Sequence, residues 1–509
     1  MAERLSGPGP ALDRDACYRA LRARDARFDG RFYTGVRTTG IFCRPVCPAR
    51  TPREENCVFF PSAAAALAGG FRPCLRCRPE LAPGTAGWRG TANTVSRAVA
   101  LIAEGAWTEG GDVEALAERV GVGGRHLRRL FERHVGAPPV AVAQVHRVLF
   151  AKRLLAETAM PISEVALASG FGSVRRFNDV VRRTYGRPPR ELRRAAGRAA
   201  PAGSGVALRL PFTRPYAWAA MLAFLGRRAI PGVEAVADGT YRRTVAVDGA
   251  RGAVAVGLAP GAASLVATIE LSSVAALPAV VGRIRRLLDL DADAAAIDAQ
   301  LMTDPLLAPR VAARPGLRVP GAWDPFELAV RAILGQQVSV AAARTLAGRI
   351  AAAFGERAGW EAFGCGLLFP GPERLAGARL AGLGLTRARA AAVSALARAV
   401  AADRSLLEPA GDLASTVDRL VALPGIGRWT AQYIAMRAFG EPDAFPDADL
   451  GLLRALERRG VRPSPAGLLR RAERWRPWRA YAALHLWTDG AAAADGVPPA
   501  GSPERREAS

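Results

Sequence analysis

Four cysteines of the chain are spaced as the ligands of a single metal ion. Cys43 and Cys47 form a C-x3-C pair, Cys74 and Cys77 form a C-x2-C pair, and 26 residues separate the pairs. Four thiolates in two close pairs suit tetrahedral Zn²⁺, with each pair on a turn. The spacing predicts one zinc ion per chain. Taken alone, it favours a structural zinc that holds a small domain together.

The residues around these cysteines are more specific than their spacing. The strings RTTGIFCRPVCPAR and NCVFFPSAAAALAGGFRPCLRCRPE resemble the N-terminal domain of the Ada-type alkylation-response proteins, over most of residues 10–85. In that family the first cysteine of the set is a zinc ligand that also accepts a methyl group from a methylphosphotriester of the DNA backbone. The resemblance assigns this role to Cys43, with Cys47, Cys74 and Cys77 as the other ligands.

Transfer of a methyl group to Cys43 is consistent with thiol chemistry. A thiolate is the nucleophile, and metal coordination keeps it deprotonated at neutral pH. Four thiolates around Zn²⁺ leave a net negative charge that repels DNA phosphate, and methylation of one thiolate weakens that repulsion. We therefore hypothesise an electrostatic switch, in which the repair event itself raises the affinity for DNA.

A helical segment over residues 93–195 contains two similar modules. Each consists of a helix, a glycine-containing turn and a basic second helix, as a helix-turn-helix requires. The second helices, RHLRRLFERHVGAPP and VRRFNDVVRRTYGRPP, complete a resemblance to AraC-type DNA-binding domains. In such a fold the second helices enter the major groove, where arginines read guanine edges. The candidate contacts are Arg125, Arg128, Arg129, Ser173, Arg175 and Arg176, with contact to phosphate or solvent alone as the alternative for each.

A short glycine motif stands out in the C-terminal half, in the string LPGIGRWTA. Gly425 and Gly427 flank an apolar residue, which predicts a tight hairpin between helices. The amides of the hairpin and of the following helix, where Arg428 and Thr430 lie, can hold a DNA phosphate without reading sequence. A G-x-G motif can equally be a helix-capping turn, but Asp449 follows 22 residues after Gly427.

A hairpin followed by an aspartate at this interval resembles the helix-hairpin-helix base-excision glycosylases. More narrowly, residues 206–488 resemble the AlkA-type 3-methyladenine DNA glycosylases, through LPFTRPYAW, FLGRRAIPGVE, RPGLRVPGAWDPFELAVRAILGQQVS and AERWRPWRAYAALHLW. The resemblance implies that Asp449 is the catalytic aspartate, with Asp447 as the nearby competitor. It also places four residues at the pocket for the flipped base and at the DNA wedge, with a core role as the alternative for the aromatic ones: Trp429, Tyr433, Trp478 and Gln337.

The expected mechanism follows from charge. An alkylated purine is cationic and already a good leaving group, so Asp449 needs only to stabilise the oxocarbenium-like sugar and help position water. The base must leave the stack to be reached, and aromatic faces attract a cation. Lyase-type relatives place a Schiff-base lysine just after the hairpin. This chain has Trp429 there and no lysine after Lys152, which predicts a monofunctional glycosylase.

Composition agrees with a nucleic-acid partner. The formal charge is +24 over 509 residues, and residues 1–200 carry a net +15 of it; such a basic field attracts a phosphate backbone. The start MAERLSGPGP has no secretory pattern and no apolar run could span a membrane. The seven cysteines do not suggest a disulfide framework, and we expect no chemistry at Cys17, Cys57 or Cys365. These observations predict a cytoplasmic, nucleoid-associated bacterial protein.

The expected fold class is multidomain and mainly α, with α+β parts. Length predicts three or four domains: a small zinc-bound α/β domain, a paired helix-turn-helix domain, an α+β domain and an all-α helix-hairpin-helix glycosylase domain. In the α+β part, VALRLPF reads as a strand, MLAFLGRRA as a helix, and TYRRTVAV with GAVAVGL as a hairpin. The boundaries that we expect are 1–88, 89–195, a linker at 196–205, 206–318, 319–490 and a disordered tail at 491–509.

These features together predict a fusion of an alkylation sensor with a repair enzyme. The expected partners are double-stranded DNA at alkylated sites and promoters, and RNA polymerase for an activator; no membrane partner is expected. One rival is a glycosylase whose zinc and helix-turn-helix parts only tether it to DNA. The other is a regulator with an inactive glycosylase half. No PCHR-type segment is present, so an O6-methylguanine transferase domain is not expected.

Overall fold

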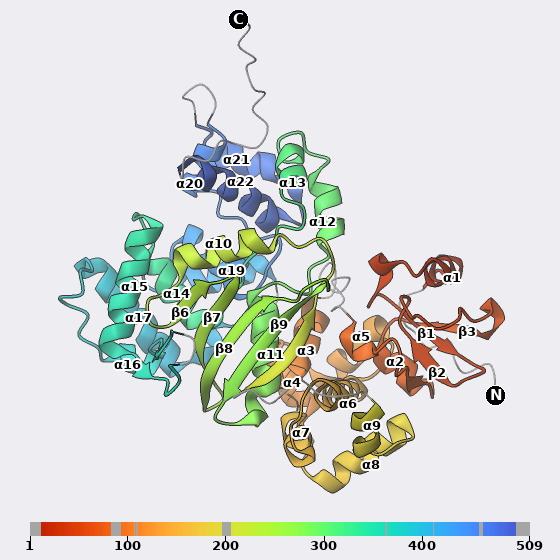
Figure 1. Ribbon diagram of the computed structural model, residues 1–509. Coiled ribbons are helices and arrows are strands. Elements are labelled where there is room, and N and C mark those ends of the chain that lie inside the picture. The colour runs from red at the N-terminus through yellow and green to blue at the C-terminus, as the bar shows by residue number, and fades with distance from the viewer. Residues whose placement is uncertain are drawn as a thin grey trace, which may run out of the picture. The chain divides into compact units, whose positions relative to one another are not determined.

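The computed structural model describes residues 12–82, 93–105, 107, 110–195, 205–361, 364–410, 412–457 and 462–494 (Figure 1). The chain divides into two compact units. One is built from Met1–Phe212 and Thr244–Arg285, and the other from Thr213–Arg243 and Arg286–Ser509. Helices dominate and the sheets are small, which confirms the predicted multidomain, mainly α class. No helix among the described residues is long and apolar enough to cross a membrane.

A four-stranded sheet organises the first 80 residues. Its strand order is β3-β1-β2-β4, antiparallel except for β4, which runs parallel to β2. Phe42 in β2 is fully buried and packs edge to face against Tyr33 of β1. The elements are α1 (Arg14–Ala23), η1 (Ala26–Phe28), β1 (Tyr33–Val36), β2 (Ile41–Cys43), η2 (Glu54–Asn56), β3 (Cys57–Phe60), α2 (Ala63–Ala68), β4 (Arg72–Pro73) and η3 (Pro79–Leu81).

The described residues from 93 to 195 form seven α-helices, which make up the two expected modules. The pairs α4–α5 and α7–α8 are joined by the long helix α6, and the apolar sides of α5 and α8 bury Leu127, Phe131 and Phe177 completely. Both basic helices end at a glycine with positive φ, Gly136 and Gly186, a conformation that glycine adopts without strain. The helices are α3 (Asn93–Ala103), α4 (Val113–Arg119), α5 (Gly124–Val135), α6 (Pro139–Glu157), α7 (Ile162–Ala168), α8 (Val174–Tyr185) and α9 (Pro189–Ala195).

A five-stranded antiparallel sheet comes next, in the order β5-β9-β8-β7-β6. The division between the two units falls within β7. The strands expected from VALRLPF, TYRRTVAV and GAVAVGL are β5, β7 and β8, and the expected helix is α10, so these predictions are confirmed. The elements are β5 (Val206–Pro211), α10 (Trp218–Arg228), β6 (Glu234–Ala237), β7 (Thr240–Val247), β8 (Ala250–Leu258), β9 (Ser264–Leu271), η5 (Val274–Ala276) and α11 (Leu277–Leu287).

Among the residues described from 294 onward, the second unit is helical apart from one short strand pair, and two apolar cores lie within it. One core is centred on α14, α15 and α17–α19, and the other on α12, α13 and α20–α22. The elements are α12 (Ala294–Leu301), α13 (Ala308–Ala313), α14 (Pro325–Leu334), α15 (Val340–Phe354), β10 (Glu356–Arg357), β11 (Leu367–Leu368), α16 (Pro372–Ala376), α17 (Arg387–Ala402), η6 (Arg404–Leu407), α18 (Leu413–Val421), α19 (Arg428–Ala438), α20 (Leu450–Ala455), α21 (Pro465–Ala472), η7 (Glu473–Trp475) and α22 (Arg479–Ala494).

Candidate functional site

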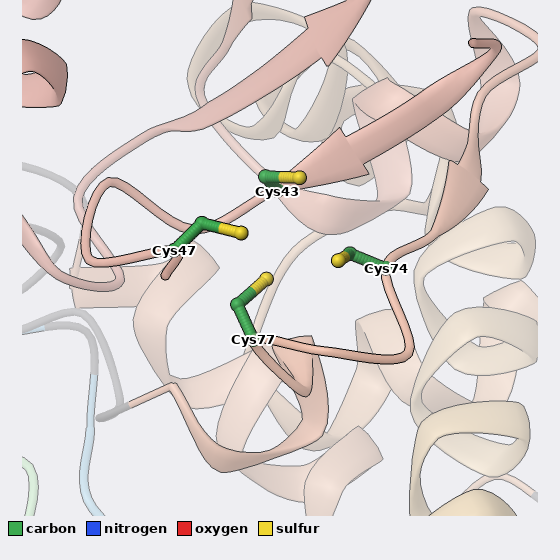
Figure 2. A group of neighbouring side chains, drawn as sticks. All are labelled: Cys43, Cys47, Cys74 and Cys77. Carbon is green, nitrogen blue, oxygen red and sulfur yellow. The ribbon is translucent and has the colours of Figure 1, made fainter. Parts of the chain in front are cut away.

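The four cysteines of the spaced set converge on one point (Figure 2). Cys43 ends β2, and the parallel pairing of β4 with β2 brings Cys74 beside it, because the Cys74 amide donates to Phe42 O at 3.0 Å. All four sulfur atoms lie within 4.8 Å of one another. In a tetrahedral zinc–thiolate site with Zn–S bonds of about 2.3 Å, the sulfurs are about 3.8 Å apart, so the donor set and its spacing fit Zn²⁺.

A neighbouring arginine orders the loop around the cysteines. The Arg44 amide donates to Cys77 Sγ at 3.3 Å, and its guanidinium donates to Cys77 O at 3.0 Å. The same guanidinium pairs with Asp29, at 2.8 Å from Nε to Oδ1. These contacts hold the second cysteine pair against the first, and the amide–sulfur contact stabilises a thiolate at Cys77.

Cys43 differs from the other three in its exposure. Cys47, Cys74 and Cys77 are each at most 7% exposed, whereas Cys43 is only partly buried. It lines a cavity of about 400 Å³ in the first unit. The cavity lining also includes four arginines that are all exposed, namely Arg50, Arg72, Arg76 and Arg187. A reactant can therefore reach Cys43 past a basic rim.

The remaining thiols are buried away from this site. Burial and the nearby Asp13 raise the pKa of Cys17 to about 11, and burial raises the pKa of Cys57 and of Cys365. All three stay protonated near neutral pH and are poor nucleophiles, in line with the expectation that they carry no chemistry.

In the helix-turn-helix segment, the arginines assigned to DNA lie on the outer faces of α5 and α8. Arg125, Arg129 and Arg175 are exposed. Arg128 is also exposed but reaches back to Glu114, at 3.2 Å between Nη2 and Oε1. Glu114 in turn accepts from the Gly124 amide at 3.0 Å. Glu114 therefore braces the start of the helix that is expected to enter the groove.

Ser173 has a local role that the sequence prediction did not include. It is the N-cap of α8, and its Oγ accepts from the amide of Arg176 at 3.1 Å. Ser173 itself and Arg176 are exposed. The hydroxyl oxygen thus caps the helix terminus, as short polar side chains at N-caps usually do, and its O–H remains a donor.

In the second unit, Asp449 is held by three N–H donors. Its Oδ1 accepts from the Leu452 amide at 3.0 Å and from the Trp487 indole at 2.8 Å, and its Oδ2 accepts from the Trp429 indole at 3.0 Å. Asp449 is also the N-cap of α20. A Cβ on Gly451 would stand 2.9 Å from Asp449 Oδ1, so a side chain at this position would displace the carboxylate. The carboxylate is fixed in orientation.

The two indoles that hold this carboxylate both contact a third ring, that of Tyr433. Trp429 and Tyr433 stack with ring centroids 5.5 Å apart and an angle of 8°, and Tyr433 meets Trp487 edge to face at 6.3 Å. Sequence reasoning missed Trp487, although it lies in the quoted string AERWRPWRAYAALHLW. Trp478, which was placed at the pocket instead, donates to Gln300 at 3.1 Å and packs against Tyr481.

Tyr433 is embedded among cations. Its hydroxyl accepts from Arg437 Nη1 at 2.6 Å. Burial raises the pKa of Tyr433, but the positive charges of Arg437, Arg228 and Arg331 outweigh burial and leave the pKa below its ordinary value. The hydrogen bond from Arg437 and the stacking on Trp429 hold the Tyr433 ring in place.

The expected hairpin lies between α18 and α19. Gly425 has a φ of 82°, and Gly427 is the N-cap of α19 with no side-chain cap, so the first amides of α19 have no side-chain acceptor. Gly427 and Arg428 are exposed, whereas Thr430 is 2% exposed. The Thr430 hydroxyl accepts from Gln336 at 3.1 Å, so the Thr430 side chain points inward. Gln337, the expected wedge, is exposed with a φ of 56°.

Comparison with known families gives four matches along the chain. The metal binding domain of Ada matches residues 16–80, and a helix-turn-helix domain matches 116–195. The AlkA N-terminal domain matches 207–324, and the HhH-GPD superfamily of base excision DNA repair proteins matches 330–480. These matches confirm the resemblances drawn from the sequence.

One relative spans almost the whole chain. The probable bifunctional transcriptional activator/DNA repair enzyme AlkA of Mycobacterium tuberculosis is 44% identical over 481 residues, which are 94% of this chain and 96% of the relative. The chain belongs to this family. In this chain the metal binding domain of Ada and the helix-turn-helix domain precede the AlkA N-terminal domain and the HhH-GPD domain.

Shorter relatives cover the two halves of this family's architecture. The DNA-3-methyladenine glycosylase 2 of Escherichia coli is 41% identical over 285 residues, 54% of this chain and 95% of that enzyme. The bifunctional transcriptional activator/DNA repair enzyme Ada of Escherichia coli is 39% identical over 146 residues, 29% of this chain and 40% of that protein. A 3-methyladenine DNA glycosylase from Archaeoglobus fulgidus shares the fold, with a TM-score of 0.50 and 24% identity over 56% of this chain and 98% of that one.

Proposed function

We propose that the second unit excises cationic alkylated purines, such as 3-methyladenine, from double-stranded DNA. The observation that carries this proposal is the carboxylate of Asp449, fixed between the indoles of Trp429 and Trp487 beside the hairpin. The relative of 41% identity named as a 3-methyladenine glycosylase supports the same substrate class. The first amides of α19 would hold a DNA phosphate, and Gln337 would fill the gap left by the flipped base.

The reaction is hydrolysis of the N-glycosidic bond. The bond from C1′ to the purine nitrogen breaks and its electron pair stays on the base, which neutralises the positive charge of the base. The developing charge on the sugar is stabilised by the Asp449 carboxylate, and water then adds to C1′ and loses a proton. The indole of Trp429, which is stacked on Tyr433 through one face, would attract the cationic base through its other face.

The product of the proposed reaction is an abasic site, with no cleavage of the DNA strand. A β-lyase step requires a Schiff-base amine, and the position after the hairpin is occupied by Trp429 rather than lysine. The one lysine of the chain, Lys152, lies in the first unit and is 5% exposed. A monofunctional glycosylase fits these residues.

Release of base from methylated DNA tests this function. The full chain is incubated under single-turnover conditions with a duplex that carries 7-methylguanine or 3-methyladenine, and the free base is quantified. We expect release by the wild type, a loss of at least about 100-fold in the Asp449→Asn variant, and release near the wild-type rate in Asp447→Asn. Equal release by wild type and Asp449→Asn would refute the catalytic assignment.

We further propose that Cys43 accepts a methyl group from a DNA methylphosphotriester. The observation that favours this second function is that Cys43 is the most accessible of the four clustered cysteines and lines a cavity with a basic rim. Zn²⁺ bound by Cys43, Cys47, Cys74 and Cys77 would keep the acceptor thiolate deprotonated. The purely structural zinc remains the competing interpretation.

Transfer of the methyl group from the phosphotriester to Cys43 needs no further reactant. The Cys43 sulfur attacks the methyl carbon, a carbon–sulfur bond forms, and the carbon–oxygen bond of the triester breaks. The electron pair of that bond goes to the phosphate oxygen, which leaves an ordinary phosphodiester anion. The acceptor loses one negative charge, so repulsion of the phosphate backbone falls and binding to promoter DNA through α5 and α8 becomes stronger.

Peptide-mapped mass spectrometry of the protein after incubation with methylated DNA tests this second function. We expect one methyl group on the peptide that contains Cys43, none after incubation with unmethylated DNA, and the same labelling in a Cys57→Ser control. Equal DNA affinity of the methylated and unmethylated protein at low salt would rule out the switch, and the absence of any methyl group on Cys43 would leave a structural zinc domain attached to a glycosylase.

A further inference from the structure

The loop between α14 and α15 is tied to the hairpin by one side chain, that of Gln336. Its amide Nε2 donates to Gly425 O at 2.9 Å and to Thr430 Oγ1 at 3.1 Å. Gly425 belongs to the hairpin, and Thr430 lies in the first turn of α19. A single amide group therefore connects the loop that carries Gln337 to both parts of the proposed phosphate site.

The same residue is held from a second side. The guanidinium of Arg389, in the first turn of α17, donates to the main-chain carbonyl of Gln336. Helix α17 also touches the hairpin directly, because a Cβ on Gly425 would stand 2.4 Å from the Cβ of Ala392. Gln336 is thus fixed through its main chain and its side chain between two elements that are themselves in contact.

The residue that follows is held in an uncommon conformation. Gln337 is exposed and has a φ of 56°, in the left-handed region that favours glycine. Such a conformation persists in a non-glycine residue only when the surrounding structure imposes it. The three contacts made by Gln336 fix the residue directly before it.

We propose that Gln336 is a positioning residue for base flipping, which sets the spacing between the hairpin and the wedge side chain of Gln337. The inference rests on the proposed glycosylase function. The hairpin that binds phosphate and the Gln337 side chain that enters the duplex then form one rigid unit. A DNA strand bound at the hairpin therefore meets Gln337 at a fixed distance. Without the side-chain amide of Gln336, DNA would still bind the hairpin. The distance between the hairpin and Gln337 would no longer be fixed, so Gln337 would not meet the site of the flipped base.

The test uses Gln336→Leu, which keeps the approximate size of the side chain and removes its donor. Gln144→Leu, at an exposed position of α6, is the matched control. Three quantities are measured on the full chain: affinity for undamaged duplex, fluorescence of 2-aminopurine next to a tetrahydrofuran abasic analogue, and single-turnover base release. A misplacement of about 1 Å can lower a rate about 100-fold, so for Gln336→Leu we expect base release to fall by about that factor.

Duplex affinity and melting temperature should stay near the wild-type values in Gln336→Leu, while the 2-aminopurine signal is lost. Combination with Gln337→Ala separates positioning from a general structural role. If Gln336 acts through Gln337, the double variant is no slower than the slower single variant; residues that act independently show additive effects. Additive losses, unchanged base release in Gln336→Leu, or a fall in melting temperature that accounts for the loss would overturn the proposal.

Failure of the proposed function is distinguishable from failure of this inference. A wild type that releases no base refutes the glycosylase function. The 2-aminopurine signal on the abasic analogue requires no excision, so the comparison of wild type with Gln336→Leu still decides whether Gln336 controls the wedge.

Discussion

Trp487 and Asp449 are joined by a hydrogen bond of 2.8 Å from the indole Nε1 to Oδ1 of the carboxylate. Trp429 donates in the same way to the other oxygen, Oδ2, at 3.0 Å. Helices α19 and α22 therefore each contribute one donor to a carboxylate that caps α20. Both oxygens are oriented before DNA binds, which is the arrangement that electrostatic stabilisation of a cationic sugar requires.

Replacement of Trp487 by phenylalanine should slow base release. The ring is kept, the N–H is lost, and a hydrogen bond to a charged group contributes about 1.5–3 kcal/mol. This corresponds to a fall of about 10- to 100-fold in the single-turnover rate. The control is Trp360→Phe, at a partly buried position between β10 and β11, which should release base at the wild-type rate. A larger loss in Trp478→Phe than in Trp487→Phe would favour the assignment made from sequence.

The case of these two tryptophans shows what the sequence could and could not predict. Both lie in one short string, nine residues apart, and a resemblance alone does not tell which of them faces Asp449. Trp478 precedes the first residue of α22, whereas Trp487 lies within that helix, which packs against α20. Which tryptophan faces Asp449 depends on where α22 begins and on which of its sides packs against α20. Both are set by tertiary packing.

Other site residues were predictable for local reasons. The cysteine spacing and the hairpin glycines are properties of short segments, so the four-cysteine cluster and the turn at the glycines could be predicted from the sequence.

Thr430 and Ser173 are predicted to contact DNA, but each hydroxyl also makes a local contact. The Thr430 hydroxyl accepts from Gln336, and the Ser173 hydroxyl caps α8. Short polar side chains often bind nearby backbone or side-chain groups in this way, and a pattern of residue types does not record it.

Removal of the metal should separate the two proposed activities. The four cysteines form a small cluster with Ile41, and the zinc ion that we propose there would hold this cluster together. We expect one zinc ion per chain by elemental analysis and loss of methyl acceptance after chelation. Base release should persist, since none of Asp449, Trp429 and Trp487 belongs to that cluster. A chelated protein that releases no base would contradict the independence of the two sites.

The buried pair of Lys152 and Glu80 should matter for stability. Their charged atoms are 2.9 Å apart, and both side chains are at most 6% exposed. Removal of one partner of a buried pair typically costs about 3–5 kcal/mol. For Lys152→Met we expect the lower end of that range, because Arg78 still pairs with Glu80 at 3.1 Å. Urea unfolding measures the change, with Arg133→Met as the exposed control; an unfolding free energy equal to that of wild type would show that the pair is dispensable.

Acid should weaken the second unit through Glu234. Burial raises the pKa of this carboxyl, but Arg331 and Arg243 outweigh burial and lower the pKa from 4.5 to about 2. Because the folded pKa lies below the ordinary one, the contribution to stability is complete above pH 4.5 and is lost as the pH falls towards 2. The urea midpoint of the wild type should drop over this window and that of Glu234→Gln should drop less. Identical pH profiles would mean that other carboxyl groups control acid unfolding.

The burial of Lys152 has a consequence for turnover. The aldehyde of an abasic site condenses with lysine amines to give imines, whereas a guanidinium is not such a nucleophile at neutral pH because it stays protonated. The single lysine of this chain is 5% exposed and engaged with Glu80. The other 69 of the 70 lysine and arginine residues are arginines. The protein can therefore hold its own reactive product closely without a side-chain covalent cross-link, and borohydride should trap no adduct through a lysine side chain.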